Sequence, residues 1–244
     1  MKNIISIQKA IIIGASSGIG KELAKILIKN NYIVGMAARR IELLKELQKE
    51  IPSKTYIKQI DVSKTEEAIK SLSLLIEEME GMDLIIICAG VDFINPELNW
   101  GLEKKTIGVN VSGFTAMADA SFNYFSKKGS GHIAGISSIA AIRGAGEAPA
   151  YNASKAFMSN YLEGLRCKAK KSRVSIDITD VKPGLVDTAM AKGEGLFWVM
   201  PPEKAALQIF KAVEHKKKQV YITRRWRIVA FLLKILPDYI YYKF

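Results

Sequence analysis

Hydrophobic residues along the chain follow two alternating patterns: short apolar runs, and longer stretches in which apolar residues recur at helical spacing. The short runs are typical of strands buried on both faces of a sheet, and the longer stretches are typical of amphipathic helices. The pattern predicts strands at 10–13, 32–37, 55–60, 83–88, 132–136, 174–181 and 220–222. It predicts helices at 21–28, 41–50, 64–80, 149–170 and 202–214, with further helices within 96–125.

This alternation of strands and helices indicates the fold class. Strand–helix–strand units build parallel sheets, and right-handed crossovers place helices on both faces. We therefore expect an α/β fold with a doubly wound parallel sheet of the Rossmann type, in a single domain. The length of 244 residues fits one such domain, which we assign to residues 1–223. Ser63 is expected to cap the helix at 64–80.

A glycine-rich turn, Gly14-Ala15-Ser16-Ser17-Gly18-Ile19-Gly20, joins the first expected strand to the first expected helix. Glycines permit a sharp turn, close approach of a ligand to the backbone and close packing of helix against strand. At a helix N-terminus such a turn holds the pyrophosphate of a dinucleotide. The motif alone is also compatible with an ordinary strand-to-helix turn, so other residues must decide between the two. The contacts predicted here are Gly14, Ser16, Ser17, Gly18, Ile19 and Gly20.

The end of the second expected strand favours NADP over NAD. Enzymes that bind NAD often place an acidic residue about 20 residues after the glycines, where it holds the adenosine ribose. This chain has Arg39 and Arg40 there instead, and a guanidinium suits a 2′-phosphate. Both arginines could also be solvated residues at a helix start, although a cation is poorly placed at that end of a helix.

Tyr151 and Lys155 form a candidate catalytic pair. They are four residues apart in an expected helix, so they share one helix face. A free phenol has a pKa of about 10, which is high for an acid that works at neutral pH. A nearby ammonium lowers the pKa of a phenol, so the spacing favours proton transfer by Tyr151. The same spacing also occurs in ordinary surface pairs.

Charge and cysteine content narrow the range of partners. Lys and Arg total 36 against 24 Asp and Glu, which gives a net charge of +12. No zinc-finger or RNA-binding motif accompanies this charge, so we predict no nucleic-acid partner. Cys88 and Cys167 have no CxxC partner and indicate reduced thiols in a cytoplasmic protein. His132 and His215 lack metal-ligand spacing, so we predict no metal site.

The C-terminal tail, residues 224–244, combines a basic start, an apolar middle and an aromatic end. Its apolar stretch is too short to cross a bilayer, which takes about 20 residues. Basic and aromatic flanks suit peripheral contact with an anionic membrane surface. An apolar helix also suits a subunit interface or packing on the rest of the chain. Both interpretations stay open from the sequence.

Taken in order, the motifs of the chain resemble the short-chain dehydrogenase/reductase family, and the resemblance covers roughly residues 8 to 223. The motifs are Gly14-x-x-x-Gly18-Ile19-Gly20, Asp61-Val62, Cys88-Ala89-Gly90, Asn110, Ser137-Ser138, Tyr151-x-x-x-Lys155 and Pro183-Gly184 with Thr188. The chain departs from the family pattern at Ile13, where threonine is usual, and at Cys88, where asparagine is usual. Both departures are expected to weaken hydrogen bonding between loops around the cofactor.

The resemblance implies specific roles for individual residues. Tyr151 would be the general acid/base, Ser138 would hold the substrate oxygen, and Lys155 would lower the Tyr151 pKa and bind the nicotinamide ribose. Asn110 would support a water-mediated proton relay to Lys155. The remaining cofactor contacts implied are Asp61, Val62, Ala89, Gly90, Pro183, Gly184, Val186 and Thr188.

Together these features predict an NADP-dependent oxidoreductase that interconverts a ketone or aldehyde and an alcohol, favouring reduction. The irregular stretch 183–201 contains the apolar run 196–200 and is typical of a lid, which favours an apolar substrate. The resemblance also implies a homo-oligomer. The alternative is a catalytically silent dinucleotide-binding protein with a regulatory role, or a scaffold at a membrane surface.

Overall fold

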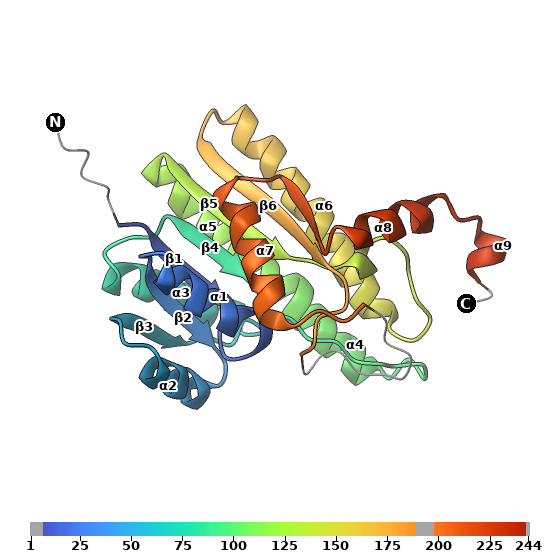
Figure 1. Cartoon of the computed structure of the whole chain (residues 1–244), viewed down its shortest axis with the longest axis horizontal. Helices are drawn as coiled ribbons and strands as arrows, with labels where there is room; N and C mark the ends of the chain where they lie inside the picture. The colour runs from blue at the N-terminus through green and yellow to red at the C-terminus, as the bar shows by residue number, and fades with distance from the viewer. Residues whose placement is uncertain (1–6, 189–197, 243–244) are drawn as a thin grey trace.

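A seven-stranded parallel sheet forms the centre of the protein, whose computed structural model describes residues 7–188 and 198–242 (Figure 1). The strand order is β3-β2-β1-β4-β5-β6-β7, and every pair of neighbours is parallel. The strands are β1 (Lys9–Ile13), β2 (Ile33–Ala38), β3 (Thr55–Gln59), β4 (Leu84–Ile87), β5 (Ser130–Ile136), β6 (Ser175–Pro183) and β7 (Gln219–Ile222).

Helices cover both faces of this sheet (Figure 1). The helices are α1 (Gly18–Lys29), α2 (Ile41–Glu50), α3 (Thr65–Glu78), α4 (Trp100–Ile107), α5 (Phe114–Lys128), α6 (Pro149–Lys171), α7 (Pro202–Glu214), α8 (Arg225–Ile235) and α9 (Asp238–Tyr241). A π-helical turn, η1 (Gly108–Gly113), joins α4 to α5, and a 3-10 turn, η2 (Ile139–Ala141), follows β5.

Two hydrophobic cores follow from the alternation of side chains along the strands. In β1, Ile11 and Ile13 belong to the core beneath α3, α5 and α6, whereas Ala10 and Ile12 belong to the core beneath α1, α2 and α7. All four residues are fully buried, as the apolar run predicts for a strand covered on both sides. The predicted doubly wound, single-domain α/β fold is confirmed.

The order of the strands places a switch point between β1 and β4. After β1 the chain moves outward to β2 and β3, and then returns to add β4 on the other side of β1. The loops after β1 and β4 therefore diverge and leave a crevice at the carboxyl ends of the strands, where ligands bind in such folds.

The predicted cap of α3 is wrong. The Ser63 hydroxyl donates to Asp61 Oδ1, and Lys64 occupies the position before the helix without a side-chain cap. Asp61 competes for the hydroxyl because it lies two residues earlier in a tight turn. The prediction of helices within 96–125 missed the π-helical turn η1, which the apolar spacing does not distinguish from a regular helix.

The tail continues the fold as α8 and α9, which extend away from the sheet at one end of the molecule (Figure 1). Trp226 is buried against Gly184: a Cβ atom at Gly184 would lie 2.0 Å from the indole ring. None of the helices within residues 7–188 and 198–242 is long and apolar enough to cross a bilayer.

Candidate active site

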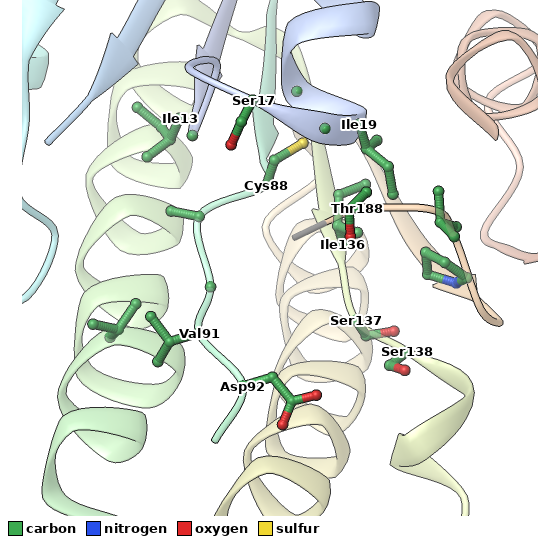
Figure 2. A pocket seen from close by; sticks show the side chains of 18 of the residues that line it. Ile13, Ser17, Ile19, Cys88, Val91, Asp92, Ile136, Ser137, Ser138 and Thr188 are labelled. Carbon is green, nitrogen blue, oxygen red and sulfur yellow. The ribbon is translucent and has the colours of Figure 1, made fainter. Parts of the chain in front are cut away.

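A cavity of about 450 Å³ lies at the switch point, at the carboxyl ends of β1, β4, β5 and β6 (Figure 2). It brings together nearly all of the residues predicted from the sequence. Those that line it are Gly14, Ser16, Ser17, Gly18, Ile19, Gly20, Arg39, Arg40, Asp61, Val62, Ala89, Gly90, Ser138, Tyr151, Lys155, Pro183, Gly184, Val186 and Thr188. Asn110 is not in the lining and lies directly behind Gly90 and Val91. Leu196 and Phe197 of the predicted lid lie outside the described residues.

The glycine-rich turn needs its glycines for close backbone packing. Gly14 has a φ of 95°, and a Cβ atom there would lie 2.6 Å from the backbone nitrogen of Ala89. At Gly20 a Cβ atom would lie 2.1 Å from the carbonyl oxygen of Gly14, so the helix could not approach the strand. Side chains at these positions would fill the space between β1, α1 and β4. The turn therefore fits the close backbone approach that a pyrophosphate requires.

Arg40 links the end of β2 to this turn. One nitrogen of its guanidinium donates to the hydroxyls of Ser16 and Ser17, at 3.3 and 3.2 Å. Arg40 is exposed and occupies the position before α2, where no side chain caps the helix. The rim of the cavity is therefore positive beside the turn, as an anionic group on a ligand would require.

Backbone hydrogen bonds connect the loops after β1 and β4 even though Ile13 and Cys88 replace the usual threonine and asparagine. The carbonyl oxygen of Ile13 accepts hydrogen bonds from the backbone nitrogens of Cys88 and Ala89, at 2.8 and 2.9 Å. Gly14 and Ala15 both donate to the carbonyl of Ala37. Backbone contacts thus join β1, β2 and β4 at the cavity. Burial raises the pKa of the half-buried Cys88 thiol to about 12, which keeps it protonated.

Ser138 and Tyr151 come from two elements that meet at the cavity. Ser138 begins η2, and its hydroxyl accepts a hydrogen bond from the Ala140 nitrogen at 3.1 Å. Tyr151 lies in the first turns of α6. Burial and the charge of Asp92 raise the pKa of Tyr151 to about 12, although a hydrogen bond with Ser138 acts to lower it. This direction is opposite to the lowered Tyr151 pKa that the resemblance implied, because burial and the charge of Asp92 together outweigh the hydrogen bond with Ser138.

Lys155 is buried next to Tyr151. Its Nζ lies 5.6 Å from the centroid of the Tyr151 ring and donates to the carbonyl of Ile136 at 3.0 Å. Burial lowers the pKa of Lys155 to about 8, although Cys88, Asp92 and Asp180 act in the opposite direction. An ammonium with this pKa can exchange a proton near neutral pH.

Asn110 fixes the loop after β4. Its Oδ1 accepts from the Val91 nitrogen and its Nδ2 donates to the Val91 carbonyl, both at 2.8 Å. The same Nδ2 donates to Ser154 Oγ at 3.0 Å. Asn110 belongs to η1, and π-helical turns inside helices are frequent at functional sites. These contacts tie the loop to α6, and the role of Asn110 in a water relay stays a prediction.

Comparison with known proteins identifies the family. The model of the short chain dehydrogenase family matches residues 8–196. The chain belongs to the short-chain dehydrogenase family. It is 28% identical over 241 residues to an oxidoreductase of Myxococcus xanthus, a match that covers 96% of this chain and 94% of the relative.

Solved structures agree with this assignment in fold. A short-chain dehydrogenase from Burkholderia cenocepacia in complex with NADP has a TM-score of 0.83 at 23% identity, over 97% of each chain. A 3-ketoacyl-(acyl-carrier-protein) reductase from Brucella melitensis complexed with NADH has a TM-score of 0.80 at 19% identity, over 88% of this chain and 96% of the other. The protein is thus an oxidoreductase of the short-chain dehydrogenase family.

Sequence reasoning missed Asp92, a carboxylate in the cavity of this short-chain dehydrogenase. Asp92 lies two residues after Gly90 and lines the cavity, as Ser138 does (Figure 2), and Tyr151 belongs to the same lining. A signal was present, because a polar residue just beyond the carboxyl end of an apolar strand lies where such folds bind ligands.

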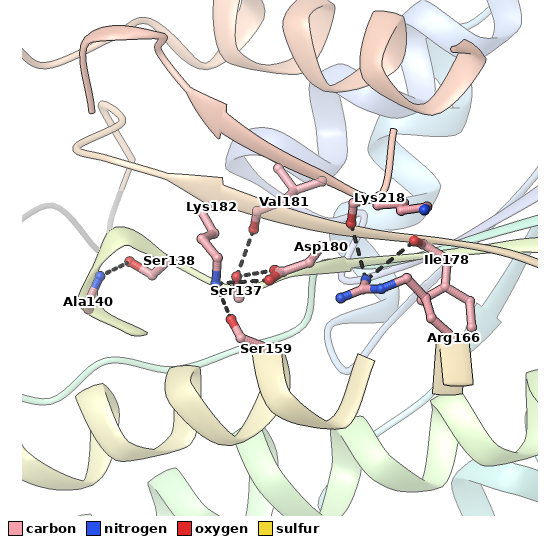
Figure 3. A network of polar contacts seen from close by, with 10 residues as sticks. All are labelled: Ser137, Ser138, Ala140, Ser159, Arg166, Ile178, Asp180, Val181, Lys182 and Lys218. Atoms are coloured by element: carbon pink, nitrogen blue, oxygen red, sulfur yellow. Dashed lines mark hydrogen bonds and ion pairs between the residues drawn. The ribbon is translucent and has the colours of Figure 1, made fainter. Parts of the chain in front are cut away.

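Sequence reasoning also missed a buried polar network behind the catalytic candidates (Figure 3). Lys182 and Asp180 of β6 form an ion pair at 2.8 Å with both side chains almost wholly buried. Ser137, next to Ser138, donates to Asp180, and Lys182 donates to Ser159 of α6. The network therefore connects the segment between β5 and η2, which contains Ser138, to the helix that carries Tyr151 and Lys155. The alternation of β6 could not reveal it, because charged residues are almost never predicted inside a sheet.

Proposed function

We propose that the protein is an NADP-dependent oxidoreductase that interconverts a ketone or aldehyde and an alcohol, with reduction favoured. The observation that supports this proposal is the convergence of Ser138, Tyr151 and Lys155 on the cavity that also contains the glycine-rich turn. A dinucleotide on the turn would reach the catalytic candidates from the side of β1 and β4. When bound, the nicotinamide group would supply or accept the hydride.

In this proposal the protein's own residues orient the substrate and move its proton. Ser138 donates a hydrogen bond to the carbonyl oxygen and holds it beside Tyr151. The phenol of Tyr151 gives its proton to that oxygen as the oxygen becomes negative. The buried phenol stays protonated at neutral pH, so it carries the proton to be given, and its hydrogen bond with Ser138 acts to lower its pKa. Lys155 restores the proton, because its lowered pKa lets it exchange with water.

NADP is proposed as the cofactor on the basis of Arg39 and Arg40, which line the rim beside the turn. The solved structures agree only on the class of cofactor, since the Burkholderia enzyme holds NADP and the Brucella enzyme holds NADH. An arginine rim stabilises the 2′-phosphate that distinguishes the two.

The catalytic role of Tyr151 is tested by comparing two substitutions on one helix. With NADPH and a panel of ketones and aldehydes, Tyr151→Phe is expected to reduce kcat by about 10² to 10⁴, because the proton donor is removed. Tyr161→Phe is the matched control, since Tyr161 lies on α6 but its hydroxyl contacts Asp119 on α5. Equal rates of NADPH oxidation in wild type and Tyr151→Phe would overturn the mechanism. NADPH binding without turnover of any carbonyl would favour the silent regulatory alternative.

We also propose that the protein works in the cytoplasm as a homo-oligomer and that residues 224–242 contact an anionic membrane surface. The tail is the part that supports membrane contact, because it exposes apolar and basic side chains together. Light scattering on the purified protein tests the oligomer. Flotation of the purified protein with lipid vesicles tests the membrane contact.

A further inference from the structure

The substrate end of the cavity contains a negative charge. Asp92 and Ser138 lie toward one end of the cavity, whereas Ser17 and the glycine-rich turn lie toward the other (Figure 2). Asp92 acts electrostatically on both Tyr151 and Lys155, so it is close to the proposed chemistry. Its carboxylate is therefore placed to meet the substrate rather than the adenosine half of a cofactor.

The position of Asp92 is fixed by the residue before it. Asn110 binds both the nitrogen and the carbonyl oxygen of Val91, so the backbone that leads into Asp92 cannot rotate without breaking two hydrogen bonds. Asn110 is fully buried and is itself held by Ser154 of α6. A carboxylate mounted on such a rigid loop can select one geometry of ligand.

One oxygen of the Asp92 carboxylate has no donor among the described residues. This oxygen, Oδ1, is shielded from solvent. The nearby ammonium of Lys155 donates instead to the carbonyl of Ile136 and contacts Met158 Sδ. Partial burial raises the pKa of Asp92, although the charge of Lys155 acts in the opposite direction. A shielded acceptor oxygen without a donor costs free energy, and a ligand that supplies the donor recovers it.

We propose that Asp92 is a specificity-determining residue that binds a protonated amine carried by the substrate close to the reacting carbonyl. The inference rests on the proposed carbonyl chemistry and specifies its substrate. An ammonium meets both needs of the site, because it donates a hydrogen bond and also neutralises the charge. A hydroxyl group would supply the donor but bring no positive charge of its own.

This substrate class modifies the expectation of a simply apolar ligand. The cavity exposes apolar side chains such as Ile139, Leu185 and Val186 as well as Asp92. An amino ketone or amino aldehyde with a hydrocarbon chain uses both, since the ammonium meets Asp92 and the chain meets the apolar wall. The substrate is therefore amphiphilic.

The test uses three ketones of equal size that differ only in one substituent near the carbonyl: an ammonium, a hydroxyl or a methyl group. With NADPH at neutral pH, wild type is expected to show a kcat/KM at least about 10-fold higher for the amino ketone than for the methyl ketone. The hydroxy ketone is expected to resemble the methyl ketone more than the amino ketone. This comparison uses only the wild-type protein, so misfolding of a variant cannot affect its result.

Variants then assign the preference to Asp92. In Asp92→Asn the ratio of kcat/KM for amino over methyl ketone is expected to fall about 10-fold or more. Asp177→Asn is the matched control, because Asp177 pairs with Lys216 away from the cavity, and its ratio is expected to match wild type. The proposal is overturned if wild type shows no preference for the amino ketone, or if Asp92→Asn keeps it. Failure to reduce any of the three ketones would instead contradict the proposed function itself.

Discussion

The charge of Asp92 also acts on the acid–base residues around it. Asp92 raises the pKa of Tyr151 and raises the pKa of Lys155, whereas burial moves these two pKa values in opposite directions. The other groups that act on the pair are Ser138, through its hydrogen bond to Tyr151, and Asp180, through its charge on Lys155. Removal of one negative charge from this group lowers both pKa values.

A pH profile tests this coupling. In the reductive direction the active form needs a protonated Tyr151 and a protonated Lys155, so activity is expected to fall as pH rises through about 8, the pKa of Lys155. Asp92→Asn is expected to move this upper limb to lower pH, because both pKa values decrease. The measurement is kcat/KM against pH with a neutral ketone. A limb that stays in place or moves to higher pH would contradict the assignment.

Arg40 is the residue expected to set the choice between the two nicotinamide cofactors. Its guanidinium lies on the serines of the glycine-rich turn and carries the only charge in that contact. Arg40→Ala is expected to weaken NADPH binding by about 10- to 100-fold, the value of a charge-assisted pair, and to leave NADH binding unchanged. Fluorescence titration with each cofactor measures this. Arg227→Ala, outside the cavity lining, is the control, and an equal loss for both cofactors would argue against a 2′-phosphate site.

At the scale of single elements, β6 combines a structural and a functional role. Its Asp180–Lys182 pair is buried between the sheet and α6, and it contacts Ser137, which directly follows β5, and Ser159 of α6. Breaking a buried pair by removal of one partner leaves an uncompensated charge, which costs about 3–5 kcal/mol. The pair therefore specifies how β5 and α6 meet at the cavity.

Urea unfolding tests the pair. Lys182→Met is expected to reduce the free energy of unfolding by about 3–5 kcal/mol, because Asp180 loses its counter-charge. The double variant Asp180→Leu with Lys182→Met removes both charges and is expected to recover most of that loss. A single variant as stable as wild type would show that the pair contributes nothing to stability.

The elements also show what the sequence can and cannot predict. The strands and the glycine-rich turn were predictable because buried apolar runs and glycines with special backbone needs are local signals. Gly14 and Gly20 are examples, since each lies against backbone that leaves no room for a side chain. The Asp180–Lys182 pair was not predictable because its stability depends on partners more than 20 residues away. The direction of the Tyr151 pKa shift depended on burial in the same way.

At the scale of the whole molecule, the tail is held firmly beside the substrate end of the cavity. Arg143, which follows η2, donates to the carbonyls of Leu233 and Leu236 at 3.3 and 3.0 Å and to Asp238 at 2.7 Å. Its guanidinium also lies 4.2 Å from the centroid of the Tyr241 ring. The free carbonyl groups at the C-terminal end of α8 thus accept hydrogen bonds from a cation, Arg143, in the loop that follows Ser138.

The outer side of this anchored tail exposes large apolar side chains. Trp226 and Ala230 face inward and are buried, whereas Ile228, Phe231 and Ile235 are 65%, 61% and 60% exposed. Tyr239 and Tyr242 extend the same surface with exposures of 71% and 76%. Four exposed basic residues accompany them, namely Arg224, Arg225, Arg227 and Lys234. Apolar and cationic side chains in this arrangement are typical of a helix that lies in the interface of an anionic bilayer.

Vesicle flotation tests this surface. Wild type is expected to float with vesicles that contain an anionic lipid and to float less at high salt, because part of the attraction is electrostatic. Phe231→Glu with Ile235→Glu is expected to abolish flotation, since it places two charges where acyl chains would lie. Leu207→Glu, which changes an exposed apolar residue on α7, is the control and is expected to float as wild type does.

Equal binding of wild type to vesicles of purely neutral lipid would contradict the electrostatic part of the proposal. Loss of a dimer in the double variant, with no flotation of wild type, would identify the surface as a subunit interface instead.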